Sequence, residues 1–206
     1  MLKCVKLLAF CGLFVSGARA QESETIFGSN ALKNSGGYAA ISNKFTTING
    51  DFANMPELYG GWFVNHRFLI GIEMAATTNR IPVPPANQTI HSSNTSYQYG
   101  QFGLMTEYSI ASRKRLHVNL NLVTGSGFIL QYERDPYDWH YEDYEHDAHF
   151  FFVMEPGIQI EANLFKWMRF SPGISYRRVF GSQARGLGDD DLSGLSGNLT
   201  LKFGRF

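Results

Sequence analysis

Residues 150–180 read FFFVMEPGIQIEANLFKWMRFSPGISYRRVF, and this stretch decides the fold class. From 148 to 163, large apolar residues occupy nearly every second position, with mostly Glu, Gly and Gln between them. The alternation returns from 168 to 180, after the short connection 164–167. Because side chains of a β-strand point alternately to opposite faces, each segment predicts a strand with one apolar and one polar face. Such segments, about ten residues long, are typical of membrane-spanning strands.

The same pattern extends through the chain. In 68–78, for example, Phe68, Ile70 and Ile72 share one face. The segment 57–65 is apolar on both faces, so its register stays open. No stretch after residue 20 reaches the roughly 18 apolar residues of a transmembrane helix. The sequence therefore predicts eight strands, at 36–46, 57–65, 68–78, 97–110, 116–132, 148–163, 168–180 and 194–206.

The connections between these strands alternate in length. The short ones are 65–67, 111–115 and 164–167, and the long ones are 47–56, 79–96, 133–147 and 181–193. Outer-membrane barrels have short turns on the periplasmic side and longer loops outside. We therefore predict an all-β fold, an up-and-down antiparallel transmembrane β-barrel of about eight strands, with both termini on the side of the short turns.

Alternation alone does not say which face lies outside, because a soluble barrel also alternates, with its apolar face inward. Here the polar face is rich in Gly, Ser and Asn and carries four acids and four bases, a set that suits a narrow lumen. The apolar face would form a very large exposed patch in water. We therefore expect lipid outside and, inside, a charge network of Lys44, Glu73, Glu107, Glu155, Glu161, Arg169, Arg177 and Lys202.

The lumen network has two interpretations. Its Glu and Arg residues could rearrange to gate a pore, or the paired charges could form a structural plug. We favour the plug, because an eight-stranded barrel is too narrow for an aqueous channel.

The first twenty residues differ from the rest. Lys3 and Lys6 precede an apolar run, and 18–20 read Ala-Arg-Ala, which predicts a cleaved signal peptide over 1–20 and a barrel domain over 21–206. Both cysteines, Cys4 and Cys11, lie in the removed segment, so no disulfide is expected. The remainder holds 15 basic and 18 acidic residues, too weak a charge to suggest nucleic-acid binding.

Two further features concern the strands. Pro-Gly-Ile recurs at 156–158 and 172–174, and a proline within a strand suggests a bulge or bend. Tyr and Trp near strand ends are expected to form the aromatic girdles found at membrane interfaces: Tyr59, Trp62, Tyr97, Tyr99, Tyr132, Trp167 and Tyr176.

The segment 135–149 is the most unusual loop, with six acids, three histidines and four aromatics. It could hold a divalent cation or form an aromatic contact surface, but its spacing matches no defined metal motif, and a variable solvated loop is the simplest interpretation. We predict no metal site or cofactor. The candidate ligand or contact residues are Asp138, His140, Glu142, Asp143, His146 and His149.

Catalysis would require a nucleophile and a base placed together. His117 is expected to point into the lumen near the turn side as a hydrogen-bonding residue, and no local His-Ser-Asn pattern of lipid A deacylase barrels is present. We therefore predict no catalytic residues. A lipid-modifying barrel enzyme is the alternative function, and a narrow pore comes third.

The stretch 150–180 and the ending Leu199-Thr-Leu-Lys-Phe-Gly-Arg-Phe206 resemble the last hairpins of small bacterial outer-membrane β-barrel proteins of the OmpA/OmpX-like class. The resemblance implies location in the outer membrane and an aromatic C-terminal signal for the barrel insertion machinery. Phe206 is out of phase with Leu199 and Phe203, so either Gly204 forms a bulge or Phe203 is the effective signal. The expected function is a non-enzymatic barrel whose external loops serve structural or surface-contact roles with an unknown ligand.

Overall fold

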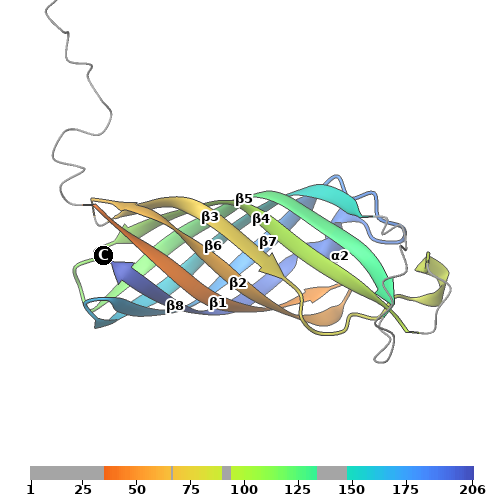
Figure 1. Cartoon of the computed structure of the whole chain (residues 1–206), viewed down its shortest axis with the longest axis horizontal. Coiled ribbons are helices and arrows are strands. Elements are labelled where there is room, and N and C mark those ends of the chain that lie inside the picture. Colours follow the sequence, from red (N-terminus) through yellow and green to blue (C-terminus); the bar gives the residue numbers. More distant parts are fainter. Residues whose placement is uncertain (1–34, 66, 90–93, 134–147) are drawn as a thin grey trace, which may run out of the picture.

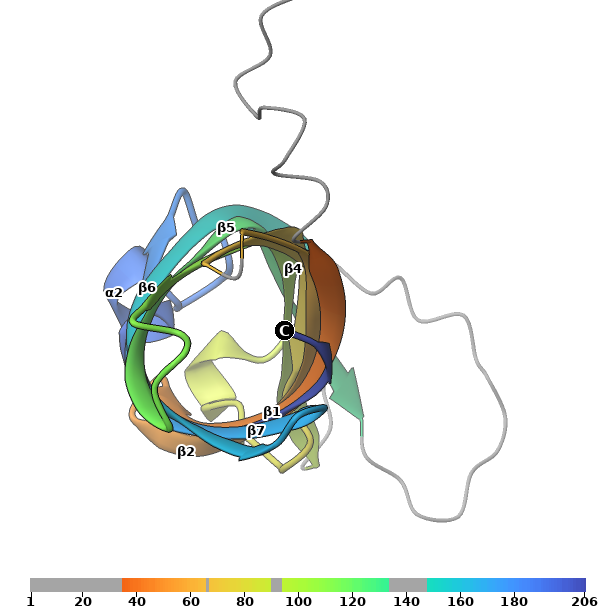
Figure 2. The ribbon, with the colours of Figure 1, turned by 90° about the vertical axis from the view of Figure 1, so that its left-hand side faces the viewer.

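The computed structural model describes residues 35–65, 67–89, 94–133 and 148–206. Eight antiparallel strands form one closed barrel in which each strand pairs with its neighbours along the chain, and the last strand pairs with the first (Figures 1 and 2). The predicted all-β, up-and-down fold of eight strands is confirmed. The strands are β1 (Gly36–Ile48), β2 (Asp51–Val64), β3 (Phe68–Ala76), β4 (Thr95–Ile110), β5 (Leu116–Glu133), β6 (His149–Phe165), β7 (Met168–Phe180) and β8 (Gly194–Arg205).

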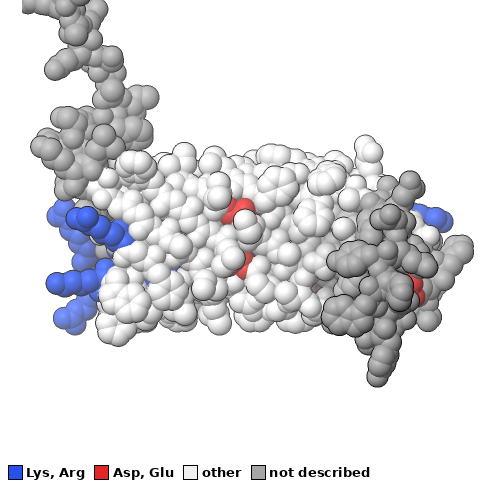
Figure 3. Space-filling model, viewed as in Figure 1, with Lys and Arg blue, Asp and Glu red and all other residues white. Residues whose placement is uncertain are grey.

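The predicted orientation of the two faces is also confirmed. Along β3, Leu69 and Glu73 are buried in the barrel, whereas Ile70 and Ile72 on the outer face are 46% and 68% exposed. The other strands repeat this arrangement, and the face of the barrel seen in Figure 3 is mostly white, with a few red atoms near its middle. Leu, Ile, Phe, Met, Trp and Tyr make up the large side chains exposed on this surface.

The prediction of a long connection at 47–56 was wrong. Asn49 and Gly50 alone join β1 to β2, with φ angles of +53° and +82°. An Asn-Gly pair in this left-handed conformation makes the tight turn whose twist matches that of the flanking strands. β2 therefore begins at Asp51, and its register follows from the pairing of Ile48 with Asp51.

Two expectations about the strands need correction. The Pro-Gly-Ile steps cause no register shift, because the strand pairing keeps one register on both sides of Pro156 and Pro172. Tyr59, Tyr97 and Tyr99 are buried inside the barrel and belong to no girdle. The positions of tyrosines in the sequence cannot distinguish the lumen from the membrane interface. A tyrosine side chain has an apolar ring and a polar hydroxyl group, and this combination suits both environments.

The two ends of the barrel differ. At the turn end, short turns join β2 to β3, β4 to β5 and β6 to β7, and the C-terminus lies here (Figure 1). At the loop end, the segment 77–89, with a short 3-10 helix η2 (Pro85–Asn87), and the segment 181–193, with the short helix α2 (Asp189–Leu192), fold back onto the barrel. Figure 2, viewed from the turn end, shows the closed ring of strands.

Side chains from the loop-end segments close that end of the lumen. Ile81, Val83, Leu187 and Leu192 are buried in one hydrophobic cluster with residues of the strands. Gln131 of β5 also fixes the first segment, donating to the Asn87 carbonyl oxygen at 2.9 Å and accepting from the Thr89 amide at 2.9 Å. None of the helices in the described ranges is long and apolar enough to cross a membrane.

The β1–β2 turn gives a matched test. Gly50→Ala places a Cβ at a φ of +82° and should lower the free energy of unfolding by about 1–2 kcal/mol. Gly197→Ala, where the added Cβ meets nothing within 4 Å and φ is ordinary, should change it by less than about 0.5 kcal/mol. Urea titrations followed by tryptophan fluorescence measure both values, and equal effects would contradict the left-handed turn.

Candidate functional site

The barrel interior is the most elaborate site in the chain. All eight charged residues assigned to the lumen from sequence lie inside the barrel and are at most 6% exposed: Lys44, Glu73, Glu107, Glu155, Glu161, Arg169, Arg177 and Lys202. Seven of them form two separate ion-pair clusters, one centred on Lys44 and one on Lys202.

The first group, called here the Lys44 cluster, combines one ammonium with three carboxylates. The Lys44 Nζ lies 2.9 Å from Glu57 Oε1, 3.0 Å from Glu155 Oε2 and 3.5 Å from Glu73 Oε1. Gln101 donates to Glu73 at 3.1 Å and to Glu155 at 2.9 Å, so it links two of these acids. The charges come from the neighbouring strands β1, β2 and β3 and from β6 on the far side of the barrel, so the cluster connects opposite walls.

Glu57 is the residue that the sequence interpretation missed. Glu57 is the first residue of the predicted strand 57–65, whose register stays open, whereas in the structure it lies in the middle of β2 and faces Lys44. The Asn49-Gly50 turn was the signal that could have found it. A two-residue turn sets Ser42 opposite Glu57, and cross-strand neighbours share a face.

The second group, the Lys202 cluster, lies towards the turn end. It contains two carboxylates and two cations, whereas the Lys44 cluster has three carboxylates for one cation. The Lys202 Nζ lies 2.9 Å from Glu107 Oε1 and 2.7 Å from Glu161 Oε2. Arg169 adds a bond of 2.6 Å to Glu161 Oε1, and the Nε2 of His117 lies 2.8 Å from the same oxygen. The other ring nitrogen of His117 lies 3.2 Å from the Lys114 carbonyl oxygen, so both nitrogens have partners within the fold.

Arg177 stands apart from both clusters. It has no ion-pair partner among the described residues. Instead its Nε donates to the Leu192 carbonyl at 2.7 Å and its Nη2 to the Thr47 carbonyl at 2.9 Å, while its guanidinium lies 4.8 Å from the Tyr99 ring centroid. Arg177 therefore anchors α2 and the end of β1 to the barrel interior. The prediction that Arg177 lies in the lumen is confirmed, but its partners are backbone carbonyl groups instead of lumen carboxylates.

The turn end of the lumen is closed by aromatic side chains. Phe206 packs against Tyr38 and Phe63, with ring centroids 5.1 and 6.4 Å away, and the Arg169 guanidinium lies 3.8 Å above its ring. Phe203 lies on the outer wall, stacked on Trp167 at 6.2 Å. The β1–β8 pairing keeps its register through Gly204, which excludes the bulge considered above.

The loop end contains one further group of interest. Asp189 accepts hydrogen bonds from the backbone amides of Gly181 and Ser182, at 3.1 and 2.7 Å, and these hold the pKa of its carboxyl below the usual value. The Arg178 guanidinium lies 2.6 Å from Asp190 on the same exposed surface. These contacts fix the segment 181–193 from outside, as Arg177 does from inside.

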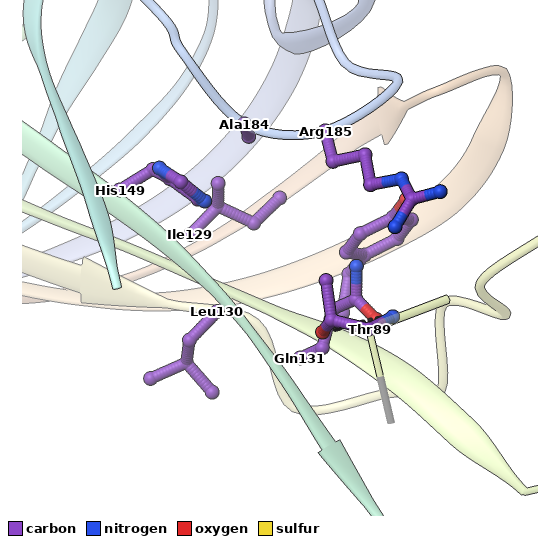
Figure 4. Close-up of a pocket in the computed structure, with 8 residues that line it drawn as sticks. Thr89, Ile129, Leu130, Gln131, His149, Ala184 and Arg185 are labelled. Carbon is purple, nitrogen blue, oxygen red and sulfur yellow. Dashed lines mark hydrogen bonds between the residues drawn. The ribbon is translucent and has the colours of Figure 1, made fainter. Parts of the chain in front are cut away.

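The proposed loop ligands fall mostly outside the described residues. Asp138, His140, Glu142, Asp143 and His146 lie in 134–147, which the structure does not describe, and His149 is the first residue of β6. His149 lines a pocket of about 10 Å³, room for about one water molecule (Figure 4). Its other lining residues are Thr89, Tyr97, Ile129, Leu130, Gln131, Ala184 and Arg185. In the part of the chain that the structure describes, no three acidic, His or Cys residues gather as a metal site.

Comparison with known proteins identifies the fold. Neisserial surface protein A has a similar structure, with a TM-score of 0.60 at 7% identity, covering 82% of this chain and 96% of that one. The Pseudomonas aeruginosa OprF N-terminal barrel domain (TM-score 0.48, 8% identity, 81% and 96% covered) and Yersinia pestis Ail (0.46, 10%, 82% and 97%) also match. No protein-family model and no curated protein matches the sequence.

The fold is thus that of the small eight-stranded outer-membrane β-barrels, the OmpA/OmpX-like class that the C-terminal hairpins resemble. The likeness to Neisserial surface protein A concerns the fold alone, since the two chains share few identical residues. Any role within this class must therefore be argued from the chain's own surfaces and interior.

The Lys44 cluster gives the second prediction. Lys44→Met keeps the length of the side chain but leaves three buried carboxylates without their cation, so it should lower the free energy of unfolding by about 3–5 kcal/mol. Arg80→Met, at an exposed position of the loop-end segment 77–89, should change it by less than about 0.5 kcal/mol. Urea titration of both variants in lipid vesicles measures the difference, and a Lys44 variant as stable as the wild type would refute the cluster.

Proposed function

We propose that this chain is an integral outer-membrane β-barrel protein, exported through a signal peptide at 1–20, which spans the bilayer with a filled interior. One observation carries the proposal: the outer wall of a closed barrel is apolar around its middle, while the charges are inside. In water, exposed apolar patches on this scale are unfavourable and rare. In hydrocarbon they are the required surface, and closure pairs the backbone groups that lipid could not satisfy.

The unequal ends indicate how the barrel would be oriented. Short periplasmic turns and longer external loops are typical of outer-membrane barrels. The turn end, with the C-terminus, would therefore face the periplasm, and the segments 77–89 and 181–193 would face outside. For insertion, Phe203 presents its ring on the outer wall whereas Phe206 packs inside, so we propose Phe203 as the aromatic side chain read by the barrel insertion machinery.

The filled interior supports a non-enzymatic role rather than a pore. Two ion-pair clusters and two hydrophobic clusters fill the lumen together, and narrow eight-stranded barrels have room only for such side chains. His117 is the described lumen histidine, and its contacts are Glu161 and a carbonyl group rather than a hydroxyl nucleophile. A changed acylation pattern of lipid A, compared by mass spectrometry with and without the gene, would instead establish a lipid-modifying enzyme.

We propose that the external loops of the barrel contact an extracellular ligand. The loop residues Asp138, His140, Glu142, Asp143 and His146, with His149 beside them in sequence, are proposed as a contact surface for an extracellular ligand. His149 supports this role, because at the loop end it lines a pocket with Thr89 of the segment 77–89 and Arg185 of the segment 181–193.

Membrane insertion is tested by two arginine substitutions on the outer wall. Ile72 and Leu116 are 68% and 65% exposed, but Ile72 lies in the middle of β3 and Leu116 at the turn end of β5. In a bilayer, Ile72→Arg should lower the free energy of unfolding by about 2–4 kcal/mol and Leu116→Arg by about 0–1 kcal/mol. A soluble barrel would tolerate both alike, because both side chains would face water.

The urea titrations are made in vesicles, and outer-membrane fractionation with heat-modifiable gel migration checks location in cells. We expect the wild-type protein in the outer-membrane fraction, with an unheated band that shifts on boiling. Equal effects of the two substitutions, or a soluble periplasmic protein, would contradict the proposal.

A further inference from the structure

The turn end of the barrel carries exposed cations without exposed acids in the described ranges. Six exposed cations lie at the turn end, where Figure 3 shows the blue patch on the left, and we call them the basic ring. All exposed or half-buried Asp and Glu side chains in the described ranges lie instead towards the loop end. The ring residues form no ion pair with any described residue. They are Arg67, Arg113, Lys114, Arg115, Lys166 and Arg205.

The basic ring lies at the border of the apolar wall. Lys166 stands between Phe165 and Trp167, whose exposed rings stack at 5.6 Å and 10°. Exposed apolar residues also directly follow Arg67 and Arg115 in the chain. In a membrane protein, aromatic rings and long cationic side chains at the edge of the apolar surface sit at the depth of the lipid headgroups.

Part of the ring surrounds open pockets. One pocket of about 280 Å³ lies between the β2–β3 and β4–β5 turns, and three cations, Arg67, Arg113 and Lys114, contribute to its lining. Arg113 also borders a second pocket of about 320 Å³, beside Arg169 and Phe206. Several cations that share one pocket and lack acidic partners are suited to a phosphate group.

We propose that the basic ring binds the phosphate groups of anionic phospholipids in the leaflet next to the turn end. The inference rests on the proposed membrane insertion. It names the class of lipid that the turn end of the barrel would bind preferentially. Clusters of four to eight Lys and Arg residues directly beside a transmembrane helix recognise anionic lipids, and the basic ring places a cluster of this size beside the apolar wall of the barrel. The bound headgroups would fix the depth of the barrel in the bilayer.

Trp167 reports on this site directly. A chain with Trp62→Phe and Trp139→Phe keeps Trp167 as its single tryptophan, next to Lys166. It is reconstituted in phosphatidylcholine vesicles that contain either brominated phosphatidylglycerol or brominated phosphatidylcholine, both of which quench nearby tryptophan fluorescence. At low salt, phosphatidylglycerol should bind about fivefold more strongly than phosphatidylcholine, and 1 M NaCl should remove most of the preference.

Matched variants assign the effect to the ring. Replacing its six cations by Gln should make the two lipids equivalent, whereas Arg80→Gln with Arg185→Gln, which neutralises two exposed cations outside the ring, should leave the preference unchanged. Equal quenching by both lipids in the wild-type background, or a preference that survives neutralisation of the ring, would overturn the proposal. Quenching by neither lipid would instead refute membrane insertion itself.

Discussion

Closure of the barrel is the constraint on which the rest of the structure depends. A backbone surrounded by hydrocarbon must pair its polar groups within the chain, and a sheet achieves this when β8 returns to pair with β1. Closure then assigns opposite requirements to the two faces of each strand. The outer positions must be apolar, and the inner positions must fill a narrow space and neutralise any charge that they carry.

The interior meets the second requirement with two different solutions. The Lys202 cluster sets two cations and a histidine around Glu107 and Glu161, whereas the Lys44 cluster holds three carboxylates around one ammonium. Two hydrophobic clusters fill the rest of the lumen, and Arg177 donates to the carbonyl oxygens of Leu192 in α2 and Thr47 in β1. The lumen thereby couples distant strands, which is consistent with a structural rather than a conducting interior.

Period-two alternation was enough to predict most strands and the face of most lumen charges, because burial on one side imposes the pattern residue by residue. It failed where local chemistry overrides the period. The tight Asn49-Gly50 turn extended β2 and brought Glu57 inside. At Phe206 the period held, because this residue is in phase with the lumen residue Lys202 and its ring packs inside. The partners within each cluster depend on the stagger between strands far apart in sequence, which alternation does not encode.

The central claim is that the apolar wall faces hydrocarbon while the ionic face is inside. The chain from residue 21 onwards contains no cysteine, so single cysteines along β3 can carry a nitroxide label in vesicles. We predict that collision rates with dissolved oxygen are high at Ile70, Ile72 and Met74 and low at Leu69, Glu73 and Ala75. High rates at the second set and low rates at the first, or no alternation along the strand, would contradict the account.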